Sequence, residues 1–446
     1  MTQGPLANVA RLVPEDSRQG DDRTDFQRDR DIILYSSALQ RLSTTTQVAS
    51  GESGHVFHNR LTHTLQVAQV GRRLAEKLII KQRELAESLS VNPDVVESAC
   101  LAQDLGHPPF GHLAEEELNK LVRDDAQGFE GNAQSFRIVT ELAFRDDKYN
   151  GLNLTNRTLR AILKYPWTYI GRPQDKRNKW GAYDSEITSF ELAIGKPGVG
   201  PFGRSAEAEL MDWADDLTYA IHDAEDFYRA GLIPLHLLLP KGSQDGEPDY
   251  TSEGQRFLNY VIAKKANLEW IKDVSDSEIR GIFAELLFVY FKLSEPYAGT
   301  RDHRARLRTF TSQLVGRYIN GLSLIDPGAD GVCVHVNQEF RKQITLLKQL
   351  TWYYVIESPG LAAQQHAHRQ VIRYLFRAFL QESRKSPSRL LPPYYRERLK
   401  KTEGDLCASR RVIADLIAGM TEAQALITYQ RLKGMVHSSA LDKHLV

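Results

Sequence analysis

Cysteine is scarce in this sequence, and its spacing excludes two kinds of site. The 446 residues contain three cysteines, which lie far apart at Cys100, Cys333 and Cys407. No two of them form a C-x-x-C pair, so neither a disulfide framework nor a thiolate zinc site is indicated. This use of cysteine is typical of a reducing compartment, and we expect a cytoplasmic location.

Long apolar runs and an excess of charge of one sign are also lacking. No run approaches the roughly 18 apolar residues that a membrane span needs, and the stretch MTQGPLANVARLVPEDSRQGDD lacks the apolar segment of a secretory signal. Lys and Arg together number 57, as do Asp and Glu. No global field therefore draws the protein to nucleic acid or anionic lipid, and we expect a soluble protein without a membrane partner.

The pattern that is present is helical. Apolar residues make up 41% of the chain, which is enough for a large core. Their spacing predicts helices over 32–42 and 58–78, a helix through VVESACLAQDL that stops near Gly106, and a long helix that ends at Gly231. Strand-like alternation is scarce, with GVCVHV as the best candidate. The sequence therefore predicts an all-α fold.

Three regions are predicted along the chain. Residues 1–24 are polar and lack periodic apolar positions, which indicates a flexible arm. Residues 25–235 form a helical core with a long loop near 172–203, where Gly, Pro, Lys and Asp are frequent and periodicity is lost. Residues 236–446 continue mainly as helical patterns.

Histidines and carboxylates cluster in the first half of the chain. The clusters are His63, the segment QDLGHPPFGHLAEE and the helix WADDLTYAIHDAED. Neutral imidazoles and carboxylates suit a divalent ion such as Mn, Mg, Fe, Co, Ni or Zn, and the pattern fits these ions equally. Such an ion would polarise a phosphate and activate water.

The Asp-rich helix carries a carboxylate, a phenol and a carboxylate on one face. Asp215, Tyr219 and Asp223 follow one another at intervals of four residues. They could share one cavity with a metal. The alternative is a solvated acidic face on a surface helix.

The GHPPFGH turn holds two histidines at a helix terminus. Its two prolines stiffen the loop between His107 and His112, and Glu115 lies one turn into the next helix. This arrangement could present a preorganised acid/base pair. The alternative is that these histidines serve only as structural hydrogen-bonding groups.

Several of these segments together resemble the deoxyguanosine triphosphate triphosphohydrolase family of the HD-domain superfamily. The similar segments cover most of the chain in the family's order: FQRDRDIILYSSALQRL, NRLTHTLQVA, DLGHPPFGH, FEGNAQSFRIV, LKYPW, KWGAYDSE, WADDLTYAIHDAED and RVIADLIAGMT. The resemblance implies an HD-domain helical core over 25–235 and a C-terminal region that packs on it and forms oligomer interfaces. It also implies hydrolysis of deoxynucleoside triphosphates, with dGTP favoured, to deoxynucleoside and inorganic triphosphate.

The family's H…HD…D set holds one divalent metal per subunit, and this chain departs from it at one position. By resemblance, His63, Asp104 and Asp215 are ligands, and Gln103 stands where the histidine of the HD pair is expected. An amide is a poorer donor to a transition metal than an imidazole nitrogen, so metal affinity should fall. One base change separates histidine and glutamine codons, so either an introduced substitution or a natural divergence accounts for Gln103.

The resemblance also assigns catalytic and substrate-binding residues. His112 and Glu115 match the proposed catalytic pair, and His107 matches a further active-site histidine. By resemblance, Tyr219 and Asp223 line the sugar and phosphate pocket, and Gln47 and Val48 lie where family members contact the sugar or base. Independently of the resemblance, Arg60 lies one helical turn before His63 and could direct its guanidinium at phosphate oxygens, with Lys164 assisting. For Gln47 and Val48, surface solvation and helix-end packing are the alternatives.

Two other functions remain as alternatives, and the resemblance implies two further partners. A general HD phosphomonoesterase or phosphodiesterase needs only the metal core, and a nucleotide-binding sensor could have lost turnover through Gln103. Family members suggest a homo-oligomer, commonly a hexamer. Some bind single-stranded nucleic acid, for which RDHRARLR and YYRERLKK could contact phosphates, although solvated helix faces also explain these segments.

Overall fold

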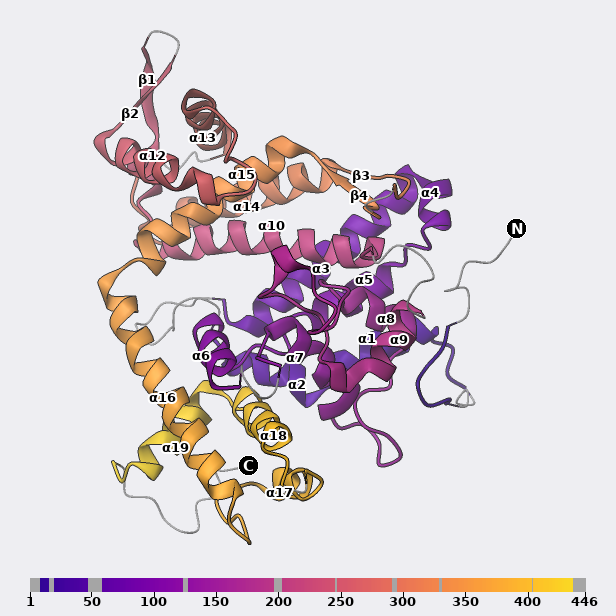
Figure 1. The fold of residues 1–446 in the computed structure, drawn as a ribbon. Helices are drawn as coiled ribbons and strands as arrows, with labels where there is room; N and C mark the ends of the chain where they lie inside the picture. The colour runs from indigo at the N-terminus through magenta and orange to yellow at the C-terminus, as the bar shows by residue number, and fades with distance from the viewer. Residues whose placement is uncertain are drawn as a thin grey trace.

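The all-α prediction is confirmed by the arrangement of the chain (Figure 1). The structure is a computed structural model that describes residues 9–15, 20–46, 58–122, 127–195, 203–244, 247–290, 295–328, 331–402 and 404–435. Within these residues, strands form only two small antiparallel pairs, β1–β2 and β3–β4. No helix of the described part is long and apolar enough to cross a membrane.

The first half of the chain is mainly helical. They are α1 Asp25–Leu34, α2 Ser37–Arg41, η1 Leu42–Thr44, α3 Arg60–Lys81, α4 Arg83–Ser88, α5 Pro93–Ala102, α6 His112–Val122, α7 Gly131–Arg137, η3 Ile138–Leu142, α8 Asn156–Ile162, η4 Gln174–Lys176, η5 Asp184–Glu186, α9 Ile187–Ile194 and α10 Ala206–Arg229.

The second half is also mainly helical. Its elements are α11 Leu235–Leu238, β1 Pro240–Gln244, β2 Glu247–Tyr250, α12 Ser252–Lys264, η6 Lys265–Asn267, α13 Asp276–Tyr290, α14 Arg301–Asn320, β3 Leu322–Leu324, β4 Val334–Val336, α15 Gln338–Thr351, η7 Trp352–Ile356, α16 Pro359–Ser383, α17 Pro393–Lys400, α18 Leu406–Ala418 and α19 Glu422–Leu432.

The centre of the fold is the packing of α3, α5 and α10 on one another. Their apolar faces belong to the large hydrophobic core, as the periodicity predicts. Gly71 allows α3 to approach α5 closely, because a Cβ atom there would lie 2.6 Å from the Cys100 sulfur. The three helices therefore form a rigid base from which polar side chains can project.

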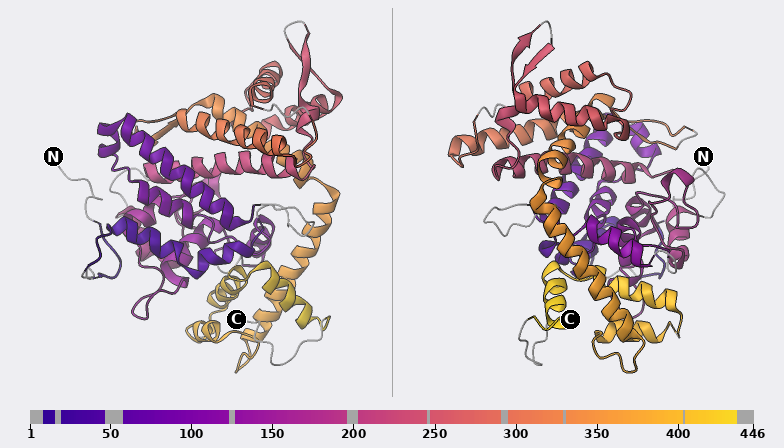
Figure 2. Two further views of the ribbon diagram at one scale, coloured as in Figure 1. Left: turned by 180° about the vertical axis from the view of Figure 1, so that it is seen from behind. Right: turned by 60° about the vertical axis from the view of Figure 1, so that its left-hand side comes forward.

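A second apolar core joins α6 to the last four helices. We call α16–α19 the C-terminal unit; α16 leaves the upper helices and runs down to α17–α19 (Figures 1 and 2). Ala114, Leu118 and Val122 of α6 are buried against residues of α16 and α18 in this core. Helix α6 is thus anchored by the C-terminal unit.

Three local predictions need correction. Part of the predicted flexible arm, residues 9–15, is attached to the core, because Arg11 donates to the buried Asp29 at 2.6 Å. The predicted loop near 172–203 contains α9 and two short 3-10 turns. The predicted helix over 32–42 is broken after Leu34, where the Ser36 side chain caps α2. The strand expected in GVCVHV is present as β4.

Candidate active site

The first wall of the site is the start of α3. The Asn59 side chain accepts a hydrogen bond from Thr62 N–H and so fixes where the helix begins. Arg60 and His63 follow on the buried face. Arg60 donates from Nη1 to Asp104 Oδ2 at 3.0 Å, so the guanidinium holds the predicted ligand beside it.

The turn after α5 is fixed from behind by Ser135. Its hydroxyl donates to the Gln103 carbonyl at 2.7 Å and accepts from Gly106 N–H at 2.8 Å. Gly106 is required here, because a Cβ atom would lie 2.1 Å from the Gly131 carbonyl oxygen. These contacts make Gln103 and Asp104 part of a rigid turn.

Two side chains from the opposite wall of the site contact Asp215 on α10. His63 Nε2 lies 3.1 Å from Asp215 Oδ1, and Gln103 Nε2 donates to the same oxygen at 3.0 Å. Burial raises the pKa of Asp215, but the hydrogen bond and charge of His63 outweigh it and lower that pKa to about 2. Asp215 is therefore an ionised carboxylate at the meeting point of α3, α5 and α10.

His112 and Glu115 form a pair at the start of α6. His112 Nδ1 lies 3.1 Å from Glu115 Oε2, and Gly131 N–H donates to the other carboxylate oxygen at 3.2 Å. Burial opposes ionisation of Glu115, yet the hydrogen bond from His112 and the charge of Lys179 lower its pKa to about 2. Glu115 is buried while His112 is exposed, so an oriented imidazole faces the solvent side.

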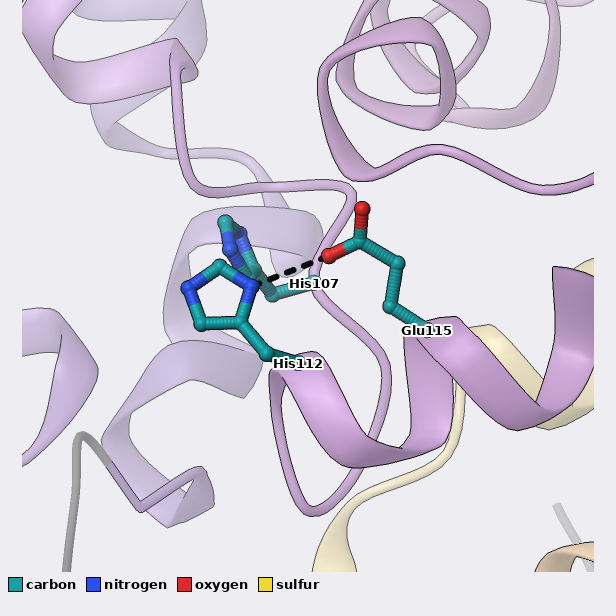
Figure 3. A group of neighbouring side chains, drawn as sticks. All are labelled: His107, His112 and Glu115. Atoms are coloured by element: carbon teal, nitrogen blue, oxygen red, sulfur yellow. Dashed lines mark hydrogen bonds and ion pairs between the residues drawn. The ribbon is translucent and has the colours of Figure 1, made fainter. Parts of the chain in front are cut away.

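His107 lies against this pair, as Figure 3 shows. Its ring is 5.1 Å from that of His112, centre to centre, and burial together with the charge of Arg60 lowers the pKa of His107 well below its usual value. Its Nδ1 lies 3.1 Å from Asp104 Oδ1 but makes no hydrogen bond there. His107, His112 and Glu115 offer ligand atoms within 4.8 Å of one another, so among the described residues they are a second candidate place for a metal.

Tyr219 and Asp223 lie along α10 beyond Asp215. The Tyr219 ring meets the His63 ring edge to face at 6.5 Å between centroids. Asp223 is buried, and burial raises its pKa to about 7. The solvated acidic face that the spacing alone allowed is therefore wrong for this helix.

A cavity of about 710 Å³ connects these groups. A volume of this size suits a small-molecule ligand. Nine of the predicted site residues line it, namely Arg60, Gln103, Asp104, His107, His112, Glu115, Lys164, Asp215 and Tyr219. His63 and Asp223 lie behind them in contact with Asp215 and Tyr219, whereas Gln47 and Val48 fall outside the described residues.

Two lysines in the cavity wall were missed by the sequence analysis. Lys179 lies 3.0 Å from Glu130 Oε1 and 3.7 Å from Glu115 Oε1, and its place in the KWGAYDSE segment is a signal that could have found it. Lys348 on α15 donates to Asp216 at 2.6 Å. No local pattern marks Lys348, because it reaches the site only through packing of α15 on α10.

Lys164 lines the cavity, but its amino group is already engaged. Its Nζ lies 2.6 Å from Asp212 Oδ1, and Arg204 binds the other oxygen of that carboxylate at the same distance. Lys164 is therefore a fixed positive charge in the wall rather than a flexible one.

Two family models match the chain. The HD domain matches residues 60–220, and the phosphohydrolase-associated domain matches residues 334–431. The first range contains the predicted ligand and catalytic residues. The second contains α15, α16, α17, α18 and nearly all of α19.

Curated relatives match over nearly their whole length. A deoxyguanosinetriphosphate triphosphohydrolase-like protein of Streptomyces coelicolor is 36% identical, with 96% of this chain and 97% of the relative covered. Proteins of the same name from Corynebacterium efficiens and Shewanella pealeana are 34% and 31% identical, with at least 89% of each chain covered. The chain therefore belongs to the family of deoxyguanosinetriphosphate triphosphohydrolase-like proteins that contain an HD domain.

Proposed function

We propose that this protein hydrolyses deoxynucleoside triphosphates, dGTP preferentially, to deoxynucleoside and inorganic triphosphate with one divalent metal per subunit. The observation that carries the proposal is the cavity, which is lined both by Asp104 and Asp215 and by the His112–Glu115 pair. Lys164, Lys179 and Lys348 add positive charge to its wall, as a triphosphate requires. The names of the relatives supply the substrate class.

The residues at Asp215 fit a metal. His63 and Gln103 each place a side-chain nitrogen 3.0–3.1 Å from Asp215 Oδ1. Asp104 is held by Arg60, and among the described residues only His107, His112 and Glu115 have ligand atoms within 4.8 Å of one another, so Asp104 must move closer to complete the set at Asp215. His63, Asp104 and Asp215 would hold the ion, with Gln103 contributing only after its amide turns its oxygen inward. When bound, the ion would polarise a phosphate and activate water.

His112 is proposed to handle the proton. Water adds to the α-phosphorus, the bond between that phosphorus and the 5′ oxygen breaks, and the 5′ oxygen leaves as the deoxynucleoside alcohol with a proton that originates from the water. Glu115 holds His112 by Nδ1, which leaves Nε2 as the ring nitrogen that can exchange a proton. His107 lies beside this pair as the further active-site histidine, and burial with the charge of Arg60 lowers its pKa well below its usual value.

A catalytically impaired nucleotide sensor is the second candidate, because Gln103 donates to Asp215 Oδ1. That hydrogen bond satisfies a ligand oxygen without a metal. A general HD phosphomonoesterase or phosphodiesterase is the third candidate.

Incubation with each dNTP and Mn²⁺, with products identified by mass, separates these functions. Triphosphate and deoxynucleoside support the proposal. Release of pyrophosphate or phosphate contradicts it. Binding of nucleotide without turnover in this protein, with turnover in the Gln103→His variant, favours the sensor.

Tyr219 is proposed as the group that excludes a 2′-hydroxyl. Its ring projects from the same face of α10 as Asp215 and lines the cavity, so we expect it to pack against C2′ of a deoxyribose. Tyr219→Ala should reduce the preference for dGTP over GTP by about 10-fold, or about 1.4 kcal/mol. Competition binding, or turnover in the Gln103→His form, measures this. Equal loss of affinity for both nucleotides would show that discrimination lies elsewhere.

We further propose a cytoplasmic homo-oligomer, a hexamer by resemblance, with single-stranded nucleic acid as an effector. The support for the effector is RDHRARLR at the start of α14, whose side chains are mostly exposed. Light scattering gives the mass of the assembly and so tests the oligomer.

The effector is tested by binding of a single-stranded oligonucleotide at increasing salt. Affinity that does not weaken with salt would contradict phosphate contacts by these arginines.

A further inference from the structure

The link between the Asp104 turn and α6 holds two consecutive residues in the left-handed conformation. Phe110 has φ of +70° and Gly111 has φ of +62°. Glycine adopts such angles without steric cost, but a phenylalanine at positive φ persists only where surrounding contacts hold it. His112 follows at once as the first residue of α6, so this link determines where His112 lies.

Glu422, the first residue of α19, binds this link from the C-terminal unit. Its Oε1 accepts from Phe110 N–H at 3.2 Å and from Thr46 N–H at 2.8 Å, and its Oε2 accepts from the Thr46 hydroxyl at 2.7 Å. Hydrogen bonds from backbone N–H groups to a carboxylate are of the stronger kind. One side chain therefore connects two separate segments that line the cavity.

The same unit holds Phe110 by its ring. His368 on α16 stacks on Phe110 with 3.9 Å between ring centroids and 17° between planes. The backbone and the side chain of Phe110 are thus bound by two different helices of the C-terminal unit.

Helix α6 is held by the unit as well. Besides its share of the second apolar core, α6 contributes Glu117, which is 3% exposed and forms a two-pronged ion pair with Arg373 of α16 at 2.5 and 3.0 Å. Both ends of the segment from Phe110 to Glu117 therefore depend on α16 or α19.

Arg41 ties the junction of α18 and α19 to the other side of the turn. Its guanidinium donates to the carbonyls of Leu105 at 2.7 Å and His107 at 2.9 Å, and to that of Met420 at 3.3 Å. Met420 lies two residues before Glu422. The backbone from Leu105 to Phe110 is thereby held at both ends: Arg41 links Leu105 to Met420, and Glu422 binds Phe110 directly.

From these contacts we infer that the C-terminal unit is a positioning element of the active site, with Glu422 as its positioning residue. Glu422 holds Phe110 in the left-handed conformation and so orients His112 and Glu115. The catalytic role of His112 and Glu115 rests on the proposed function, whereas the contacts by which the C-terminal unit holds the turn do not. In this inference the phosphohydrolase-associated domain holds the active-site turn of the HD domain in place.

Hydrogen–deuterium exchange on the full chain tests how the turn is held. In Glu422→Ala, exchange of the peptide that contains Phe110 should rise by about 10-fold or more, since its N–H loses its acceptor. Asp405→Ala is the matched control: it removes another carboxylate of the C-terminal unit that binds backbone N–H groups, those of Cys407 and Ala408. It should leave exchange at Phe110 unchanged.

A second variant separates positioning from general loss of structure. A glycine at position 110 adopts positive φ without help from other contacts. Glu422→Ala should therefore change kcat less in the Phe110→Gly protein than in the protein that keeps Phe110. In the parent, Glu422→Ala should lower kcat by about 10-fold with KM changed less than about 2-fold. These rates are measured in the Gln103→His form.

Three outcomes overturn the inference. They are unchanged exchange in Glu422→Ala, equal effects of Glu422→Ala and Asp405→Ala, and an undiminished effect of Glu422→Ala in the Phe110→Gly background. Absence of triphosphate release from all forms would contradict the proposed function, while the exchange experiment would still decide how the turn is held.

Discussion

Gln103→His is expected to bring the metal content close to one ion per chain and to raise turnover of dGTP by about 100-fold or more. Even the loss of a partner behind a metal ligand costs about 10- to 100-fold in affinity or activity, and here the substitution supplies an imidazole at a proposed ligand position. Gln103 already ends 3.0 Å from Asp215 Oδ1 at the C-terminal end of α5. An imidazole from this position can reach the same centre as His63 and Asp215.

Elemental analysis of the purified proteins, followed by turnover with added Mn²⁺, measures both effects. Gln103→Leu is the matched control, because it keeps the bulk of the side chain and offers no donor atom; it should hold no more metal than the unaltered protein. Equal and nearly stoichiometric metal in the glutamine and histidine forms would mean that Gln103 ligates well enough or that the ligand set is misassigned.

Asp215→Ala in the Gln103→His form decides between the two candidate metal positions. If the ion lies at Asp215, removal of this carboxylate should abolish metal binding, since the side chains of His63 and residue 103 both converge on it. Retention of metal would instead place the ion at His107, His112 and Glu115, whose ligand atoms also converge.

The ligand set and the catalytic pair were assigned by resemblance to the family, and the parts of the site that the residues predict without it are those governed by local geometry. A spacing of four residues on α10 is enough to put Asp215 and Tyr219 on one face, whatever the rest of the chain does. The two prolines of the HPPFGH turn likewise predict a stiff connection into α6. Because such geometry depends on near neighbours, the sequence carries it directly.

Contacts between distant segments could not be predicted in this way. Arg60 was assigned to phosphate by its place before His63, yet it also pairs with Asp104, 44 residues away. Glu422 reaches Thr46 across 376 residues, and its position at the start of a helix looks like ordinary helix capping chemistry in the sequence. Such pairs depend on how whole helices pack, which periodicity does not specify.

His112→Ala in the Gln103→His form is expected to lower turnover by about 100- to 10,000-fold, the range typical of a positioned acid or base. His112 is largely exposed, so its truncation should cost little stability and should leave Glu115 bound to Gly131 N–H. His335→Ala is the matched control, because His335 is an exposed histidine on β4, remote in the chain from the turn, and its loss should leave kcat unchanged.

Metal content determines how the His112→Ala result is understood. If the imidazole exchanges a proton, the variant keeps its metal while kcat falls, and KM changes little because the side chain acts mainly in the transition state. If metal is lost along with activity, His112 is a ligand, and the centre lies in the cluster with His107 and Glu115. The Asp215→Ala protein would then keep its metal. A metal at Asp215 therefore predicts metal loss in Asp215→Ala and retention in His112→Ala, and a metal at His112 predicts the reverse.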